Sequence, residues 1–289
     1  MLYYNVTNFF ATPLILLMRI FILLLCLQSA ALCAAPRVVT SIAPLHELTA
    51  AIMKDVGEPA LIIKDQASAH HFAFKPSHMR SLQRADLVIW VGRQFEAGFN
   101  RVPEVLPRSA QQLELLTALG IENGDGHVWY SPKLLLRSIE IIVTALTKLD
   151  PENRAQYRVN AESLIEAIET WRADKQAQWL NRQPRFITDH AFTAHFEADI
   201  GFEAIATIHD QHDAHGGFKD LNRIESLLRT NPAACLLTLE SPASPLAQNL
   251  AQKYQMQIVN VLTMAATNPQ SPLSVQRLDQ LNVALRDCL

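Results

Sequence analysis

Three of the ten histidines in this 289-residue chain lie where α/β proteins usually place side chains for chemistry. His70 follows a β-branched run, His127 lies in a glycine-rich loop, and His190 ends another apolar run. In an open α/β sheet, ligands bind at the loops beyond the carboxyl ends of the strands. Three neutral imidazoles converging there would bind Zn²⁺, and they would also suit Cu²⁺ or Ni²⁺. The pattern therefore predicts one divalent-metal site.

The spacing of these histidines leaves an alternative open, because a single loop histidine is more often exposed to solvent than bound to a metal. The chain has no HExxH motif, and no pair of cysteines lies near a histidine. Three further histidines, His46, His78 and His195, fall on helical patterns, and we expect them to be structural or surface residues.

A second group of histidines lies between residues 209 and 215. His209, His212 and His215 share this loop with two aspartates. Short His-rich tracts can bind metal weakly. The sequence therefore leaves two interpretations: an accessory low-affinity metal site, or a solvated polar loop that holds no metal.

The element that must position these loops is the stretch Pro151–Arg182. It contains no glycine and no further proline, and its apolar residues recur in steps of three, four and seven. This period predicts one long helix, with Asp150 as its capping carboxylate and a length of about 45 Å. It would link two lobes; the alternative is a surface helix of one larger domain.

On each side of this stretch, short β-branched runs alternate with helical patterns. That alternation predicts a mostly parallel sheet with helices on both faces. We therefore expect an α/β fold of two Rossmann-like lobes joined by one long α-helix, with the metal site in the cleft between them. The predicted boundaries are 36–150, 151–183 and 184–289. Strands are expected at 37–42, 60–64, 86–92, 112–116, 185–188, 203–208, 235–239 and 256–261.

Residues 1–35 have the pattern of a secretory signal peptide. A basic Arg19 precedes eight apolar residues and a run of small ones. Met18 suits this pattern better than Met1 as the start. Export implies an oxidising compartment, where Cys235 and Cys288 would pair in a disulfide; two buried free thiols are the alternative.

The charge of the chain excludes one class of partner. The 25 basic and 28 acidic residues give a net charge of −3, with no basic excess and no block of like charge. The sequence therefore offers nothing for nucleic acid to bind.

Three segments resemble the ligand segments of ZnuA-type proteins, the zinc-binding periplasmic components of ABC transporters. The first is SAHHFAFKPS at 68–77, followed by LQRADLVIWVG at 82–92. The second is GHVWYSP at 126–132, similar to the family pattern D-x-H-x-W-x-x-P. The third is DHAF at 189–192, and the two cysteines match a pair found in many zinc-type members.

The resemblance implies that His70, His127 and His190 bind Zn²⁺ at high affinity. It also implies delivery of the metal to an ABC permease and its ATPase, in the periplasm and as a monomer. The family's aspartate ligand in the last loop has no counterpart in 261–267. That leaves the fourth position to water, His71 or Glu240, and it argues against manganese or iron.

Two other functions remain compatible with a three-histidine site. A zinc-dependent periplasmic hydrolase would use a zinc-bound water, with Glu240, Asp189 or Asp125 as base. A periplasmic metal chaperone or adhesion-related protein would keep the same fold. No carboxylate has motif spacing to a ligand, and the resemblance is to binding proteins, so we expect no enzyme.

Overall fold

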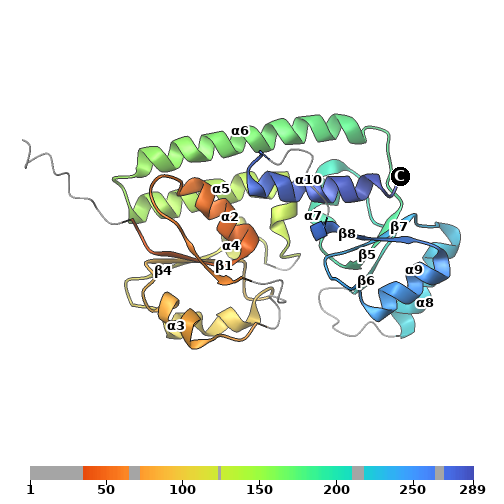
Figure 1. Ribbon diagram of the computed structural model, residues 1–289, viewed down its shortest axis with the longest axis horizontal. Helices are drawn as coiled ribbons and strands as arrows, with labels where there is room; N and C mark the ends of the chain where they lie inside the picture. Colours follow the sequence, from red (N-terminus) through yellow and green to blue (C-terminus); the bar gives the residue numbers. More distant parts are fainter. Residues whose placement is uncertain (1–34, 65–71, 123–124, 210–217, 264–269) are drawn as a thin grey trace, which may run out of the picture. The chain divides into compact units, whose positions relative to one another are not determined.

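The computed structural model describes residues 35–64, 72–122, 125–209, 218–263 and 270–289. The predicted signal peptide lies outside these residues. No helix in the described part is long and apolar enough to cross a membrane. Residues 36–289 form one compact unit, which contains two sheets (Figure 1).

The two sheets are each four-stranded and wholly parallel, with the same relative strand order. The first sheet has the order β2-β1-β3-β4 and the second has β6-β5-β7-β8. The strands of the first are β1 (Val38–Ile42), β2 (Ala60–Ile63), β3 (Leu87–Trp90) and β4 (Gln111–Glu114). Those of the second are β5 (Phe186–His190), β6 (Ala206–His209), β7 (Cys235–Thr238) and β8 (Gln257–Asn260).

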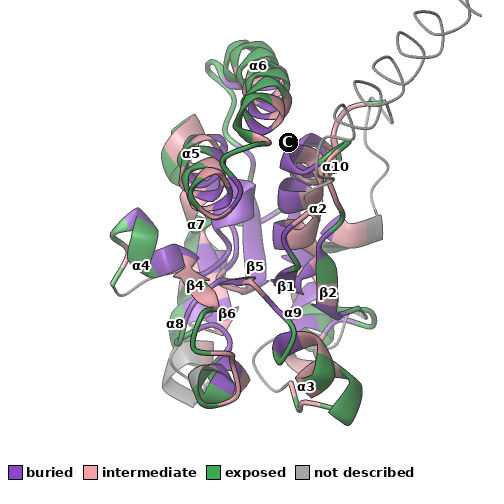
Figure 2. Cartoon of the chain, turned by 90° about the vertical axis from the view of Figure 1, so that its left-hand side faces the viewer, coloured by how far each residue is buried: buried purple, intermediate pink, exposed green. Residues whose placement is uncertain are grey.

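The central strands are largely buried because helices cover both faces of each sheet. Every residue of β1, β3 and β7 is buried, and Figure 2 shows this core in purple. The covering helices are α2 (Ala43–Ile52), α3 (Pro76–Leu82), α4 (Leu115–Leu119), α5 (Pro132–Leu149), α7 (Ala194–Ile200), α8 (Phe218–Thr230), α9 (Pro245–Tyr254) and α10 (Leu273–Arg286). Short 3₁₀ helices are η3 (Ala97–Glu104), η4 (Val128–Tyr130) and η5 (Val261–Thr263).

The predicted linking helix is present as α6, Arg154–Trp179, and contacts both lobes. In the N-terminal lobe, the Asn160 side-chain amide donates to the carbonyls of Ile52 and Lys54. At the other end, the Trp179 indole donates to the Asn282 side chain on α10 over 2.7 Å. The two-lobe α/β fold joined by one long helix is therefore confirmed, and Figure 1 shows α6 in green.

The predicted start of this helix was wrong by one turn. Asp150 does not cap α6, since residues 151–153 form a turn and α6 begins at Arg154. The Asp150 carboxylate accepts instead from the Asn153 amide and the Tyr157 hydroxyl, each over 2.8 Å. These bonds hold the corner between α5 and α6.

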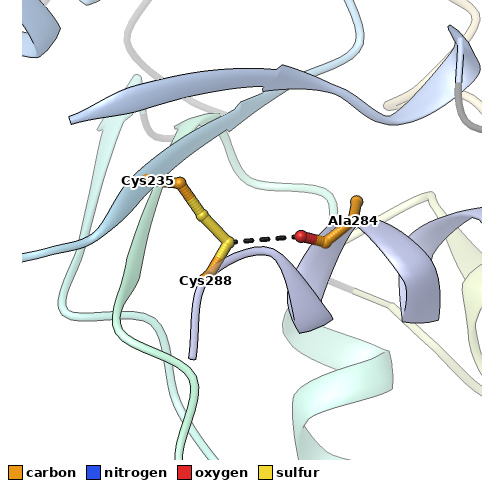
Figure 3. Close-up of a disulfide and its surroundings, with 3 residues drawn as sticks. All are labelled: Cys235, Ala284 and Cys288. Carbon is orange, nitrogen blue, oxygen red and sulfur yellow. Dashed lines mark hydrogen bonds between the residues drawn. A yellow bond between two sulfur atoms is a disulfide. The ribbon is translucent and has the colours of Figure 1, made fainter.

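Helix α10 ties the C-terminal end of the chain to both lobes. Arg277 donates two hydrogen bonds to the Glu47 carboxylate on α2, at 2.5 and 2.6 Å. Past its end, Cys288 forms the predicted disulfide with Cys235 at the start of β7, with 5.3 Å between the two Cα atoms (Figure 3). Both cysteines are fully buried, and because their sulfur atoms are bonded to each other the structure does not have the two buried free thiols of the alternative.

Candidate metal centre at the lobe interface

His127 lies just before η4 and is held by a carboxylate two residues earlier. Its side chain is almost completely buried. Asp125 Oδ1 accepts from the main-chain N of His127 at 2.9 Å and lies 2.6 Å from ring Nδ1. A carboxylate can only accept, so Nδ1 carries the proton and Nε2 keeps its lone pair in the neutral ring. This is the arrangement that fixes the tautomer of metal-binding histidines in proteins.

The Asp125 carboxyl remains ionised in this environment. Burial acts to raise its pKa, but the hydrogen bonds from the ring and main chain of His127 outweigh burial and hold the pKa of Asp125 below its ordinary value. An ionised Asp125 is the stronger acceptor, so it orients the ring and increases the electron density at Nε2.

Aromatic side chains fix the remaining freedom of the His127 ring. Phe95 and Trp129 pack against it edge-on, with centroid distances of 5.0 and 5.1 Å. Gly126 allows the close approach, because a Cβ there would lie 2.3 Å from Phe95 Cδ2. The packing of Phe95 against this loop therefore requires a glycine at position 126.

His190 is the last residue of β5, in the other lobe. Its ring centroid lies 5.3 Å from that of His127, and Phe192 packs against both rings at 5.2 and 6.2 Å. The side chain is half-buried. The structure therefore brings two of the three predicted ligands together, one from each lobe.

Asp189, the residue before His190, is tied to its own lobe. Its carboxylate accepts from the Ser244 hydroxyl at 2.8 Å, the Ser244 main chain at 3.3 Å and the Thr238 hydroxyl at 3.4 Å. Ser244 is also the N-cap of α9. These bonds join β5, β7 and α9 at the carboxyl edge of the sheet, where His190 projects.

Helix α7 follows His190 and binds the loop that carries His127. His195 Nε2 lies 2.7 Å from the carbonyl oxygen of Asp125. Asp199 accepts from the Ser131 hydroxyl at 2.6 Å and the Lys133 main chain at 3.1 Å. The C-terminal lobe thus contacts the His127 loop both before and after the histidine.

The other predicted site residues do not join this pair in the described part of the chain. His70, His71, His212 and His215 lie outside the described residues. Glu240 is exposed after β7, and its carbonyl accepts from the Asn260 amide. Among the residues the structure describes, no group of three or more His, Cys, Asp or Glu side chains could hold a metal.

The location predicted for His209 was wrong. It is not a loop residue but the last residue of β6, paired in register with His190. Its Nε2 lies 3.9 Å from Asp189 Oδ1, and its side chain is 30% exposed. Main-chain pairing reaches the carboxyl end of β6, since the Ala191 N–H donates to the His209 carbonyl.

The structural role expected for two other histidines is confirmed. His46 lies 3.0 Å from the carbonyl of Pro59, and His78 Nδ1 accepts from the main chain of Lys75 at 3.1 Å. Sequence reasoning missed the roles of Asp125 and His195. The D-x-H spacing marks Asp125 in the sequence, whereas no sequence signal marks a contact across 70 residues.

The fold and the paired histidines define a class: the two-lobed, metal-binding solute-binding proteins. Residues 38–280 match the family described as ZnuA, zinc-uptake complex component A, periplasmic. The match spans most of the chain, so the chain belongs to this family.

Individual relatives are distant but extend over most of both chains. The chain is 22% identical to the high-affinity zinc uptake system protein ZnuA of Brucella abortus, over 87% of this chain and 91% of that protein. A zinc-bound AdcAII variant of Streptococcus pneumoniae has a TM-score of 0.73 at 17% identity, over 89% and 99% of the two chains. A manganese-bound periplasmic metal-binding protein variant of Candidatus Liberibacter asiaticus has 0.71 at 19%, over 88% and 100%.

Members of this family are extracytoplasmic, non-enzymatic components that deliver metal to an ABC permease and its ATPase. The chain is accordingly a metal-binding component of an ABC transporter and not an enzyme, as expected from the sequence. One of the two solved structures binds zinc and the other binds manganese, so similarity to them does not determine which metal this chain binds.

Proposed function

We propose that this chain is a high-affinity zinc-binding protein that holds Zn²⁺ between its lobes through His70, His127 and His190. The observation that carries the proposal is the pair of imidazoles from different lobes, 5.3 Å apart between centroids. Asp125 on Nδ1 leaves Nε2 of His127 as the donor atom. The ring is therefore oriented before any metal arrives.

The donor chemistry favours zinc over the harder divalent metals. Imidazole suits Zn²⁺, whereas carboxylates and water suit Mn²⁺. The segment 261–267 contains no carboxylate, and the Asp189 carboxylate is occupied by Ser244 and Thr238. A water, His71 or Glu240 completes the coordination, and His212 and His215 with His209 form at most an accessory, weaker site.

The same proposal includes delivery and location. The loaded chain passes Zn²⁺ to an ABC permease and its ATPase, and it acts in the periplasm as a monomer after removal of residues 1–35. Because the three proposed ligands come from both lobes, metal binding changes the free energy of the contact between the lobes. The permease can recognise the loaded state through that change.

The test is metal stoichiometry with competition affinity on the metal-stripped chain, first for Zn²⁺ and then for Mn²⁺. We expect one tight zinc and much weaker manganese. His190→Ala should weaken zinc by more than about a hundredfold, beyond the range usual for residues that only support a ligand. Circular dichroism checks that the variant is folded.

The matched control removes two other histidines. In His212→Ser with His215→Ser, the tight site should keep its affinity and only weak additional zinc should be lost. His209 stays in place because it belongs to β6. Loss of the tight site in this control, with unchanged affinity in His190→Ala, would refute the site between the lobes.

A further inference from the structure

We propose that His195 is a positioning residue of the metal site: from the C-terminal lobe it fixes the loop that carries His127. The inference rests on the proposed function, because it concerns the same site. His195 lies on α7, five residues after His190. It does not bind the metal; its partner is the carbonyl of the residue that orients the other ligand.

His195 contacts the main chain of Asp125 directly. His195 Nε2 lies 2.7 Å from the carbonyl oxygen of Asp125, which can only accept. The ring therefore donates from Nε2, and the half-buried site keeps that bond from free exchange with water. A ring engaged in this way is fixed in tautomer as well as in place.

Asp125 holds His127 through its side-chain carboxylate. Its carboxylate holds the main chain of His127 at 2.9 Å and ring Nδ1 at 2.6 Å. One residue thus connects His195 to the imidazole of His127. If the Asp125 peptide shifted, the carboxylate would shift with it, and Nε2 of His127 would move relative to His190.

The C-terminal part of α7 contacts the segment that follows His127. Asp199, one turn further on, accepts from Ser131 and Lys133, which follow His127. The segment 190–199 therefore begins with one ligand and then binds the other ligand's loop on both sides. Before metal arrives, α7 therefore joins the two histidine segments directly, alongside the longer connections through α6 and α10.

The two contacts of α7 differ in what they touch, and this difference gives a matched control. His195 acts on Asp125, which contacts the ligand. Asp199 acts on the start of α5, where Ser131 caps the helix by accepting from Leu134 at 3.0 Å. If α7 only held the lobes together, the two contacts would be equivalent for metal binding.

The experiment uses the full mature chain and three variants: His195→Ala, His195→Gln and Asp199→Asn. Zinc affinity is measured by competition, and stability by thermal unfolding without metal. Nitrogen-15 signals of the His127 ring, also recorded without metal, report its tautomer and order. Glutamine can donate from its side-chain amide, so it can replace the lost bond.

We expect His195→Ala to weaken zinc about tenfold, the lower end for residues that support a ligand, and to broaden or shift the His127 signals. His195→Gln should regain most of the affinity, and Asp199→Asn should stay within about twofold of the parent. Equal losses in His195→Ala and Asp199→Asn would overturn the proposal, as would unchanged affinity and ring signals in His195→Ala. A parent chain that binds no zinc would refute the proposed function instead, and the metal-free ring signals would still decide whether His195 positions His127.

Discussion

The two lobes have the same sheet topology but present their histidines in different ways. His190 ends a central strand, with sheet neighbours on both sides and a half-buried ring. His127 comes from a connection beyond the edge strand β4 and is only 4% exposed. The sheet positions His190, whereas a set of side chains around a loop positions His127.

This difference explains where the supporting residues are concentrated. A strand end inherits its position from main-chain pairing, so His190 needs only the bonds of Asp189 to its own lobe. A loop has no such frame. His127 instead depends on Asp125, on the Phe95 ring and, from the other lobe, on His195. Variants on the two sides should therefore behave differently.

The largest expected effect is on the free energy of unfolding, and it comes from Glu96, the residue after Phe95. Its side chain is fully buried, and it accepts from the main-chain N of Val91 at 2.7 Å. Burial raises the pKa of Glu96 to about 7, and the hydrogen bond from Val91 opposes this shift only in part. The folded chain therefore binds this proton at a pH where the unfolded chain has lost it.

The sign of the pH dependence follows from that order of pKa values. The contribution of Glu96 to stability is full below about pH 4.5, falls as the pH rises, and is lost above about 7. Glu96→Gln cannot ionise, so we expect the parent to lose about 3 kcal/mol relative to this variant between pH 4.5 and 8. Denaturant unfolding of the metal-free chains at several pH values measures this difference.

Glu114→Gln is the control for the removal of a carboxylate from the same lobe. Glu114 lies on β4 and pairs with Arg93, whose side chain is 72% exposed, so this pair should contribute little. A parent and a Glu96→Gln variant whose stabilities run parallel from pH 4.5 to 8 would show that Glu96 is not the titrating group.

The second effect tests the orientation of His127 directly. Asp125→Ala removes the acceptor of ring Nδ1, so the tautomer and the direction of Nε2 are no longer fixed. We expect zinc affinity to fall about 10- to 100-fold, as is usual when the carboxylate partner of a metal-binding histidine is lost. Competition titration measures it, and Asp125→Asn, which keeps one acceptor oxygen, should lose less. Equal affinity in parent and Asp125→Ala would mean that aromatic packing alone orients the ring.

The sequence predicted the two sheets and the long helix better than it predicted the supports, the side chains that hold His127 and His190 in place. Strand runs such as Leu87–Trp90 are apolar throughout because both faces are covered, and the period of the long helix records one buried stripe. Such patterns are local, so the two sheets and α6 could be found. The pair Cys235–Cys288, 53 residues apart, was found because residues 36–289 contain only these two cysteines. The failures were at ends: α6 begins at Arg154, and β6 extends through His209.

The supports other than Asp125 could not be predicted because they depend on distances between residues far apart in the chain. The spacing D-x-H marks Asp125, since two residues suffice for its carboxylate to reach its neighbour's ring. His195 reaches Asp125 across 70 residues, through packing of the lobes that no period in the sequence encodes. A histidine on a helical pattern is therefore interpreted as structural until its partner is known.

The smallest expected effect concerns His190, and it tests whether the sheet alone positions this residue. Ser244→Ala removes a 2.8 Å bond to Asp189 and the cap that accepts from Ala247 at 3.2 Å. Loss of an N-cap destabilises a protein by about 1 kcal/mol, so unfolding should show that loss. Zinc affinity should change by less than about threefold, below the range for residues that orient a ligand.

The reason for this small change is that β5 remains paired with β6 and β7 when Ser244 is altered. His190 therefore keeps the position that the sheet gives it, and only the end of α9 loosens. Ser244→Thr keeps a hydroxyl and should restore the stability, which separates the cap from the loss of side-chain volume. If Ser244→Ala weakened zinc as much as Asp125→Ala, the strand end would depend on its side-chain support as the loop does, and the two lobes would not differ in how they hold a ligand.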